Sequence, residues 1–168
     1  VEVHDSCVDR KDFYASYGLI VPRGLTSKRI KAMNLRKHIQ EGIVERELLV
    51  READRLGVSI SEDELDDELA TGRAHLSLPI ANAQYLAYSL QLDQDWVRPL
   101  PVKSTQTDQF DYKIYERVVR NTTNRSPKEF KEMQRHEMIA ARMRALVSSR
   151  VRVSEAEAWL QYQRERST

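Results

Sequence analysis

The chain has 168 residues, 40% of them hydrophobic and 32% charged, which is enough for one domain with its own core. Lysine and arginine exceed aspartate and glutamate by one, so net charge gives no argument for binding to nucleic acid or to a membrane surface. A single cysteine, Cys7, excludes an internal disulfide, and no apolar run reaches the length of a membrane-spanning helix. With only five glycines and five prolines, the composition predicts a compact all-α fold of several helices in one domain, residues 1–168.

The N-terminal part predicts a short strand and then a helix. Residues 1–3 alternate Val-Glu-Val, which is typical of an extended segment. Asp9 can cap a helix that carries Phe13, Tyr14 and Tyr17, and the breaker-rich segment 18–26 ends it.

A long central helix is predicted from Ser27 to Leu56, with Gly57 in the left-handed position after its end. Gly42 lies inside the pattern and predicts a bend or a close helix contact. In the second half the apolar positions point almost all the way round the axis, so we expect other elements to surround it on all sides. These positions are Ile43, Val44, Leu48, Leu49, Val50, Ala53 and Leu56.

An acidic helix follows, from a capping box at Ser61 and Glu64 to about Gly72. Six acidic residues and no basic one lie between Ser61 and Leu69, whereas residues 117–152 hold ten basic residues against three glutamates. This segregation is consistent with two helices that face each other.

Residues 73–109 form an irregular segment that interrupts the helical pattern. Because the segment is too long for a structureless connection, it either makes its own helices, with one predicted over 81–92, or forms a functional excursion. Its aromatic residues and one leucine, with two aromatic residues from the start of the next helix, are our candidates for an exposed peptide-binding surface. Core packing is the alternative for each. The candidates are Tyr85, Tyr88, Leu92, Trp96, Phe110 and Tyr112.

Three more helices are predicted towards the C-terminus. One begins near Phe110 and ends in the Asn-Thr-Thr-Asn segment 121–124. The next, about 126–149, has a capping box at Ser126 and Glu129, and its Glu137 lies near an apolar face and needs a partner if it is buried. The last runs over 154–166. The apolar positions expected to be buried in the second of these helices are Phe130, Met133, Ile139, Ala140, Met143, Leu146 and Val147.

The residue patterns that mark catalytic, metal and cofactor sites do not occur in the sequence. The glycines are scattered rather than grouped in a phosphate-binding loop, and His38, His75 and His136 are far apart, with no marked nucleophile. His4, Asp5 and Cys7 lack a second ligand pair, so we predict no metal, no cofactor and no catalytic residue. One alternative is a phosphate-binding stripe of Arg135, Arg142, Arg144, Arg150 and Arg152, but apolar residues interrupt it and we predict no nucleic-acid binding.

The order of these motifs resembles the N-terminal chaperone domain of SurA- and PpiD-type foldases, which are cell-envelope chaperones that usually carry parvulin prolyl-isomerase domains. The resemblance covers most of the chain outside 73–109. It rests on Arg10-Lys11-Asp12-Phe13, the run from Ile43 to Leu65, Phe110-Asp111-Tyr112 with Tyr115, Ser126-Pro127-Lys128-Glu129-Phe130 and Val151-Arg152-Val153-Ser154-Glu155-Ala156-Glu157.

The resemblance implies ATP-independent binding of unfolded polypeptide in the periplasm or elsewhere in the cell envelope. Its parvulin domain would follow the helix at 154–166, where this sequence stops, so we expect no isomerase activity from the chain. An apolar groove could stay open or be filled by helix exchange in a homodimer. Met133, Met138 and Met143 could contact clients, with core packing as the alternative. Two alternatives stay open: a helical module that docks one folded partner, and a client-capture fragment of a longer isomerase.

Overall fold

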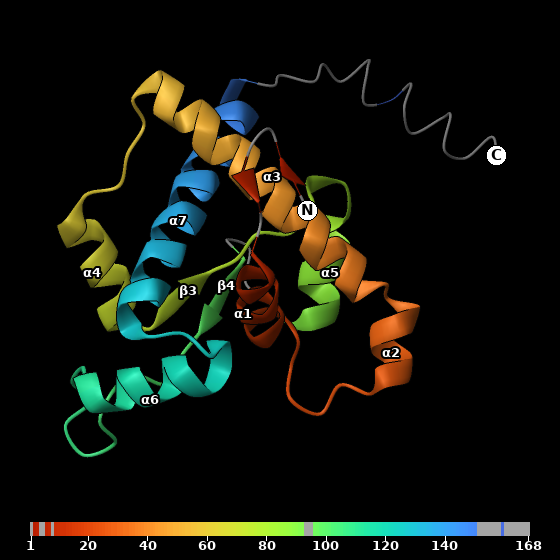
Figure 1. The fold of residues 1–168 in the computed structure, drawn as a ribbon. Helices are drawn as coiled ribbons and strands as arrows, with labels where there is room; N and C mark the ends of the chain where they lie inside the picture. Colours follow the sequence, from red (N-terminus) through yellow and green to blue (C-terminus); the bar gives the residue numbers. More distant parts are fainter. Residues whose placement is uncertain (1, 4–5, 8, 93–95, 151–158, 160–168) are drawn as a thin grey trace.

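A computed structural model describes residues 2–3, 6–7, 9–92, 96–150 and 159 of the chain (Figure 1). The described residues form seven α-helices, one short 3₁₀ helix and two small antiparallel sheets of two strands each, which confirms the all-α prediction. The helices are α1 (Arg10–Ile20), α2 (Ser27–Ala32), α3 (Leu35–Leu56), α4 (Glu62–Thr71), α5 (Ala83–Leu90), α6 (Tyr112–Thr123) and α7 (Pro127–Arg150). The remaining elements are β1 (Glu2–Val3), β2 (Ser6–Cys7), β3 (Arg73–His75), the 3₁₀ helix η1 (Ile80–Asn82) and β4 (Val97–Pro99).

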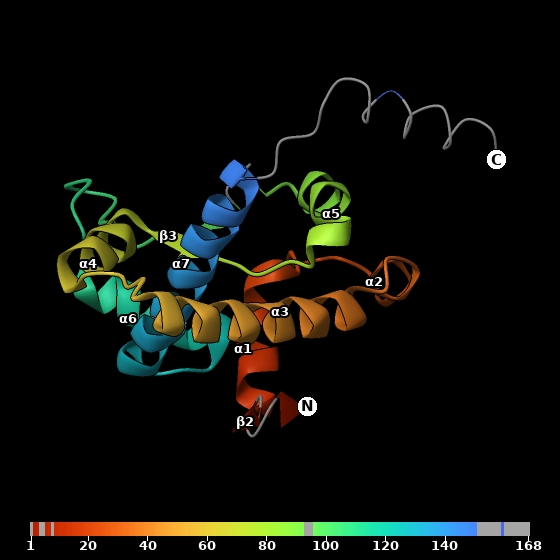
Figure 2. The ribbon, with the colours of Figure 1, turned by 90° about the horizontal axis from the view of Figure 1, so that it is seen from above.

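The long helix predicted from Ser27 is interrupted, so that prediction is wrong in part. Met33 ends α2, and Asn34 takes a left-handed conformation with φ of 50° before α3 begins at Leu35. Asparagine is one of the few residues that tolerate this conformation, but nothing in the apolar spacing marks the break. The resulting turn lets α2 leave the axis of α3 (Figure 2).

Helix α3 is central, but other elements do not surround it on all sides. Ile39, Ile43 and Ala53 are fully buried, and α3 packs most extensively on α7. Leu48 and Leu56 are 45% and 52% exposed, which contradicts the expected full enclosure. The apolar positions that point away from α7 lie on the solvent side, where single hydrophobic residues are common.

The acidic helix α4 faces the basic side of α7, as the charge segregation predicted. Lys131 binds Asp66 at 2.5 Å and Glu62 at 3.0 Å, and Arg135 also pairs with Glu62. Two helical turns further along α7, Arg142 pairs with Glu64 and donates to the Ser59 carbonyl oxygen. These arginines are therefore engaged within the protein rather than lined up for a phosphate backbone.

The irregular segment 73–109 makes its own helix, which confirms one of the two predicted alternatives, and several of its described residues pack into the core. β3 pairs with β4, and between them η1 and α5 occupy residues 80–90 where the sequence predicted a helix over 81–92. Leu78, Leu86 and Leu90 are fully buried. A Cβ atom on Gly42 would lie 2.3 Å from the Ser77 carbonyl oxygen, so this glycine permits close approach of an extended segment, not of a helix.

The capping residues predicted from sequence begin their helices as expected. Ser61 accepts a hydrogen bond from the Glu64 backbone, and Ser126 and Glu129 exchange the reciprocal bonds of a full capping box. The third predicted box, at Ser154, and nearly all of the helix expected at 154–166 lie outside the described residues. Only Trp159 in that range is described, and it is exposed.

Helix α7 buries most, but not all, of the apolar residues predicted for its core face. Phe130, Ile139 and Ala140 are buried, as are Met133, Met138 and Met143, so these methionines belong to the core. Leu146 and Val147 are 39% and 51% exposed, which contradicts the prediction for them. The last turns of α7 project beyond the packed part of the domain and leave both side chains at the surface (Figure 2).

Candidate functional site

A pocket lies between the irregular segment and the C-terminal half of α7, and we call it the α5–α7 pocket. Its volume of about 650 Å³ is in the range of ligand-binding sites. One wall is formed by η1 and the start of α5, the other by small residues of α7, and Figure 2 shows α5 beside this end of α7. The lining residues are Arg73, His75, Ile80, Ala81, Asn82, Ala83, Gln84, Tyr85, Trp96, Ala141, Arg144, Ala145 and Ser148.

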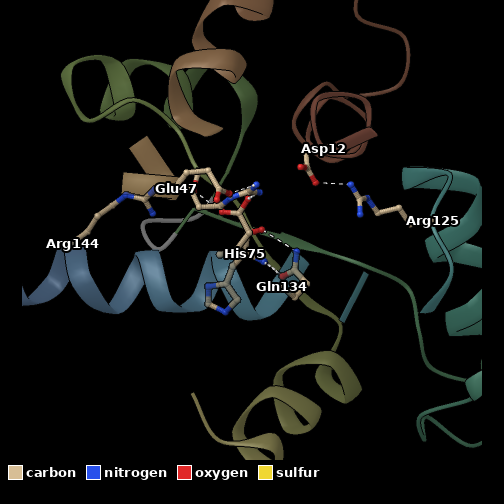
Figure 3. A network of polar contacts seen from close by, with 9 residues as sticks. Asp12, Glu47, His75, Arg125, Gln134 and Arg144 are labelled. Carbon is tan, nitrogen blue, oxygen red and sulfur yellow. Dashed lines mark hydrogen bonds and ion pairs between the residues drawn. The ribbon is translucent and has the colours of Figure 1, made fainter. Parts of the chain in front are cut away.

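The floor of the pocket is a strand fixed to α7 by an amide side chain. Gln134 is fully buried; its side-chain oxygen accepts from the His75 backbone N–H at 2.7 Å, and its Nε2 donates to the His75 carbonyl at 3.2 Å (Figure 3). This pair of bonds gives β3 a partner on α7 as well as on β4. These hydrogen bonds therefore fix the position of β3, with its Arg73 and His75, relative to α7.

Carboxylate Glu68 orients two polar side chains at the rim. Its Oε2 lies 2.8 Å from His75 Nε2 and accepts from Arg73 Nε at 2.9 Å. The other ring nitrogen of His75, Nδ1, is buried and has no hydrogen-bond partner among the described residues. His75 therefore has an unused donor or acceptor position beside the pocket.

Trp96 is held in place by a cation. Its backbone has a φ of 55°, and the Arg144 guanidinium carbon lies 4.9 Å from the ring centroid. Arg144 in turn donates to Ser77 Oγ at 2.7 Å and lies 3.4 Å from Glu45. Because Arg144 is 9% exposed, the position of the indole is coupled to buried side chains of α3 and of the irregular segment.

A buried ion pair joins α3 to α7, and Ser77 connects it to Arg144 of the pocket. Arg46 Nη1 donates to Glu137 Oε1 at 2.9 Å, and these residues are 2% and 1% exposed. Ser77 donates to the other Glu137 oxygen at 2.5 Å. Burial by itself would lower the pKa of Arg46, but the attraction of Glu137 and Glu47 outweighs it and holds the pKa above its usual value. The predicted need of Glu137 for a partner is confirmed.

The structure brings two of the six predicted peptide-binding residues together in the α5–α7 pocket. Tyr85 is 61% exposed and lines it opposite the small residues of α7, and half-buried Trp96 lines it from the other side. Tyr88 is on the same helix and 88% exposed, but it is not among the lining residues. Leu92 is partly buried and packs against the core, which was the alternative for each candidate.

Phe110 and Tyr112 lie elsewhere, at the beginning of α6. Both rings contact Tyr115, with centroid distances of 5.7 and 6.0 Å, and Tyr115 contacts Phe130 of α7. Burial raises the pKa of the Tyr115 hydroxyl to about 12. Both outer rings are partly exposed, but α5 and α6 are well separated in Figures 1 and 2, so the six residues do not form one surface.

The polar residues of the pocket were not predicted from the sequence. Alternation in Arg73-Ala74-His75-Leu76 is a strand signal, and a strand would have placed Arg73 and His75 on one face. Arg144 and Gln134 carry no local signal of this kind, because their partners are 48 or more residues away in the chain: His75 for Gln134, and Trp96 and Ser77 for Arg144.

Two structural findings concern metal binding and membrane insertion. Among the residues that the structure describes, no three metal-binding side chains come together, while His4 and Asp5 lie outside this part. In the same part of the chain, no helix has both the length and the hydropathy needed to cross a lipid bilayer.

No family model, no curated protein and no solved structure matches the chain. The resemblance to foldase chaperone domains therefore stays a prediction from the motifs of the sequence.

Proposed function

We propose that the chain binds unfolded or nascent polypeptides of the cell envelope without ATP and without catalysis, and that the α5–α7 pocket is a contact site. The observation that carries this proposal is the partly open pocket of about 650 Å³ with Tyr85 and Trp96 in its walls. The motif resemblance to foldase chaperone domains points to the same class of ligand.

The pocket has the properties required to hold an apolar side chain of an extended segment. Ile80 and Tyr85, each 61% exposed, provide apolar surface, and Ala141 and Ala145 leave space on the opposite wall. Covering exposed apolar surface is favourable by about 25 cal/mol per Å². A client side chain that enters this space would be removed from water, which lowers its tendency to aggregate.

Suppression of aggregation tests the proposal directly. Several unrelated proteins are diluted from denaturant with and without the chain, and light scattering is followed without nucleotide. We expect the chain to reduce scattering for all of them, and Tyr85→Ala to reduce this protection. Tyr88→Ala is the matched control on the same helix, because Tyr88 is exposed outside the pocket. If clients aggregate equally with excess chain, the proposal is wrong.

A docking site for one folded partner is the second candidate. It is favoured by the fixed position of Trp96, which Arg144 holds 4.9 Å from its guanidinium carbon, since a preformed pocket suits a single shape. Tight binding of one folded protein, together with no effect on several unfolded clients, would support this candidate over the first.

The proposal extends to location and assembly. A client-binding chain of this class would act in the periplasm or elsewhere in the cell envelope, and a longer parent protein could add a parvulin isomerase domain. Two copies could complete their cores by helix exchange. Sedimentation of the purified chain at two concentrations tests the dimer, and a purely monomeric species at both would contradict it.

A further inference from the structure

A second pocket, of about 450 Å³, lies between the C-terminal end of α1, β4 with the residues just after it, and α6. We call it the arginine pocket, because every charged side chain among its lining residues is an arginine: Arg23, Arg98 and Arg117. The rest of the lining is mainly apolar or small. It consists of Gly18, Leu19, Val21, Pro22, Pro99, Leu100, Pro101, Val118, Asn121 and Thr122.

Arg98 is the most deeply placed of the three cations. Its Nε donates to the Leu19 carbonyl at 3.0 Å and its Nη2 to the Ile20 carbonyl at 3.1 Å. Desolvation lowers the pKa of Arg98. A guanidinium has five N–H donors in a planar fork, so the two bonds leave donors unused.

Arg23 and Arg117 add two exposed charges to the same pocket. Neither they nor Arg98 forms an ion pair with any residue that the structure describes, whereas Arg46, Arg135, Arg142 and Arg144 all do. The bonds of Arg98 to the end of α1 also satisfy helix carbonyls, which explains why one arginine lies there. These two hydrogen bonds do not explain why three arginines, and no carboxylate, are among the lining residues of the arginine pocket.

We propose that the arginine pocket binds an acidic side chain of a polypeptide client whose neighbouring residues are apolar. The inference rests on the proposed function and adds a preference to it. Three guanidinium groups supply charge and N–H donors that match a carboxylate. A free inorganic oxyanion would leave the apolar walls uncovered, whereas a peptide segment can place apolar side chains against Val21, Leu100 and Val118.

Two peptides of about 15 residues test the preference. One contains aromatic residues and two glutamates, the other has glutamine in place of each glutamate, and binding is measured by calorimetry at low and at physiological salt. We expect the glutamate peptide to bind at least about fivefold more tightly at low salt, and the difference to shrink as salt screens the charges.

The double variant Arg23→Glu/Arg117→Glu should abolish this preference without loss of fold, because both side chains are exposed and form no ion pair within the described residues. Its matched control is Lys28→Glu/Lys31→Glu, which changes net charge equally on exposed sites of α2. The control should keep most of the preference for the glutamate peptide. Equal loss in both variants would show a general charge effect and overturn the pocket assignment.

Other outcomes separate this inference from the proposed function. Equal affinity of the wild-type chain for both peptides overturns the inference and leaves polypeptide binding in place. No binding of either peptide contradicts both. NMR gives an independent readout: the Arg98 Nε–H resonance should shift on addition of the glutamate peptide. An equal shift with inorganic phosphate alone at the same concentration would assign the pocket to free oxyanions and overturn the peptide proposal.

Discussion

Glu137 is the residue whose environment follows most directly from its chemistry. A carboxylate on an apolar helix face must find a partner, and the structure supplies Arg46 and Ser77. The identity of these partners could not be predicted, because they lie 91 and 60 residues away in the sequence. The partners of His75 and Arg144 could not be predicted for the same reason, because a local sequence pattern gives no information on contacts between distant parts of the chain.

Removal of one member of the buried ion pair should be strongly destabilising. We predict that Glu137→Leu lowers the free energy of unfolding by about 3–5 kcal/mol, because it leaves Arg46 buried without its main partner. Arg46→Met/Glu137→Leu should recover a large part of this loss. Urea unfolding followed by circular dichroism measures both values. A single-variant loss below about 1 kcal/mol would contradict the assigned geometry.

Leu48 and Ile43 test which face of α3 is in the core. Ile43 is 1% exposed and Leu48 is 45% exposed, so we predict a loss of about 2–5 kcal/mol for Ile43→Ala and less than about 1 kcal/mol for Leu48→Ala. The apolar spacing predicted that both residues lie in a helix surrounded on all sides. In that case both alanine variants would lose a large part of the free energy of unfolding. Equally large decreases in the free energy of unfolding, measured with urea, would contradict the exposed position of Leu48.

At the scale of elements, the chain order and most helix ends could be predicted from capping chemistry. Asp9 and Ser61 each accept a backbone N–H at a helix start, and Gly57 ends α3 with a φ of 70°. The break at Asn34 was missed because the same apolar stripe continues across it. The strands β3 and β4 were missed because each has three residues and their pairing spans the irregular segment.

The contact of α4 with α7 should depend on pH through Glu62. Hydrogen bonds from Lys131 and Arg135 hold the pKa of Glu62 below its ordinary value of 4.5. A carboxyl group with a lowered pKa in the folded state contributes its full stability above 4.5 and loses it as pH falls through the folded pKa.

The test variant is Glu62→Gln, and its matched control is Asp67→Asn. Asp67 is an exposed acidic residue of α4 that forms no ion pair within the described residues. We predict that Glu62→Gln lowers the melting temperature at pH 6, and that its difference from the wild type shrinks towards pH 3 and at high salt. Asp67→Asn should change the melting temperature less at pH 6. A difference for Glu62→Gln that is independent of pH would contradict the assigned ion pairs.

At the scale of the whole molecule, the site depends on the segment that the sequence described least well. Residues 73–109 were expected to be either helical or a functional excursion. Of the described residues in this range, several pack into the core, and others form one wall of the α5–α7 pocket. Tyr85 and Trp96, two of the six predicted residues, line this pocket. The sequence could not separate them from Tyr88, Leu92, Phe110 and Tyr112, because exposure and distance are set by the tertiary fold.

The most direct test of polypeptide binding at the α5–α7 pocket is an NMR titration of the chain with a reduced, carboxymethylated protein that cannot refold. The Trp96 indole N–H resonance is followed, with Trp159→Phe used to assign it. We predict a saturable shift that Tyr85→Ala weakens and Tyr88→Ala leaves unchanged. An indole resonance that does not move at saturating unfolded protein would contradict the account.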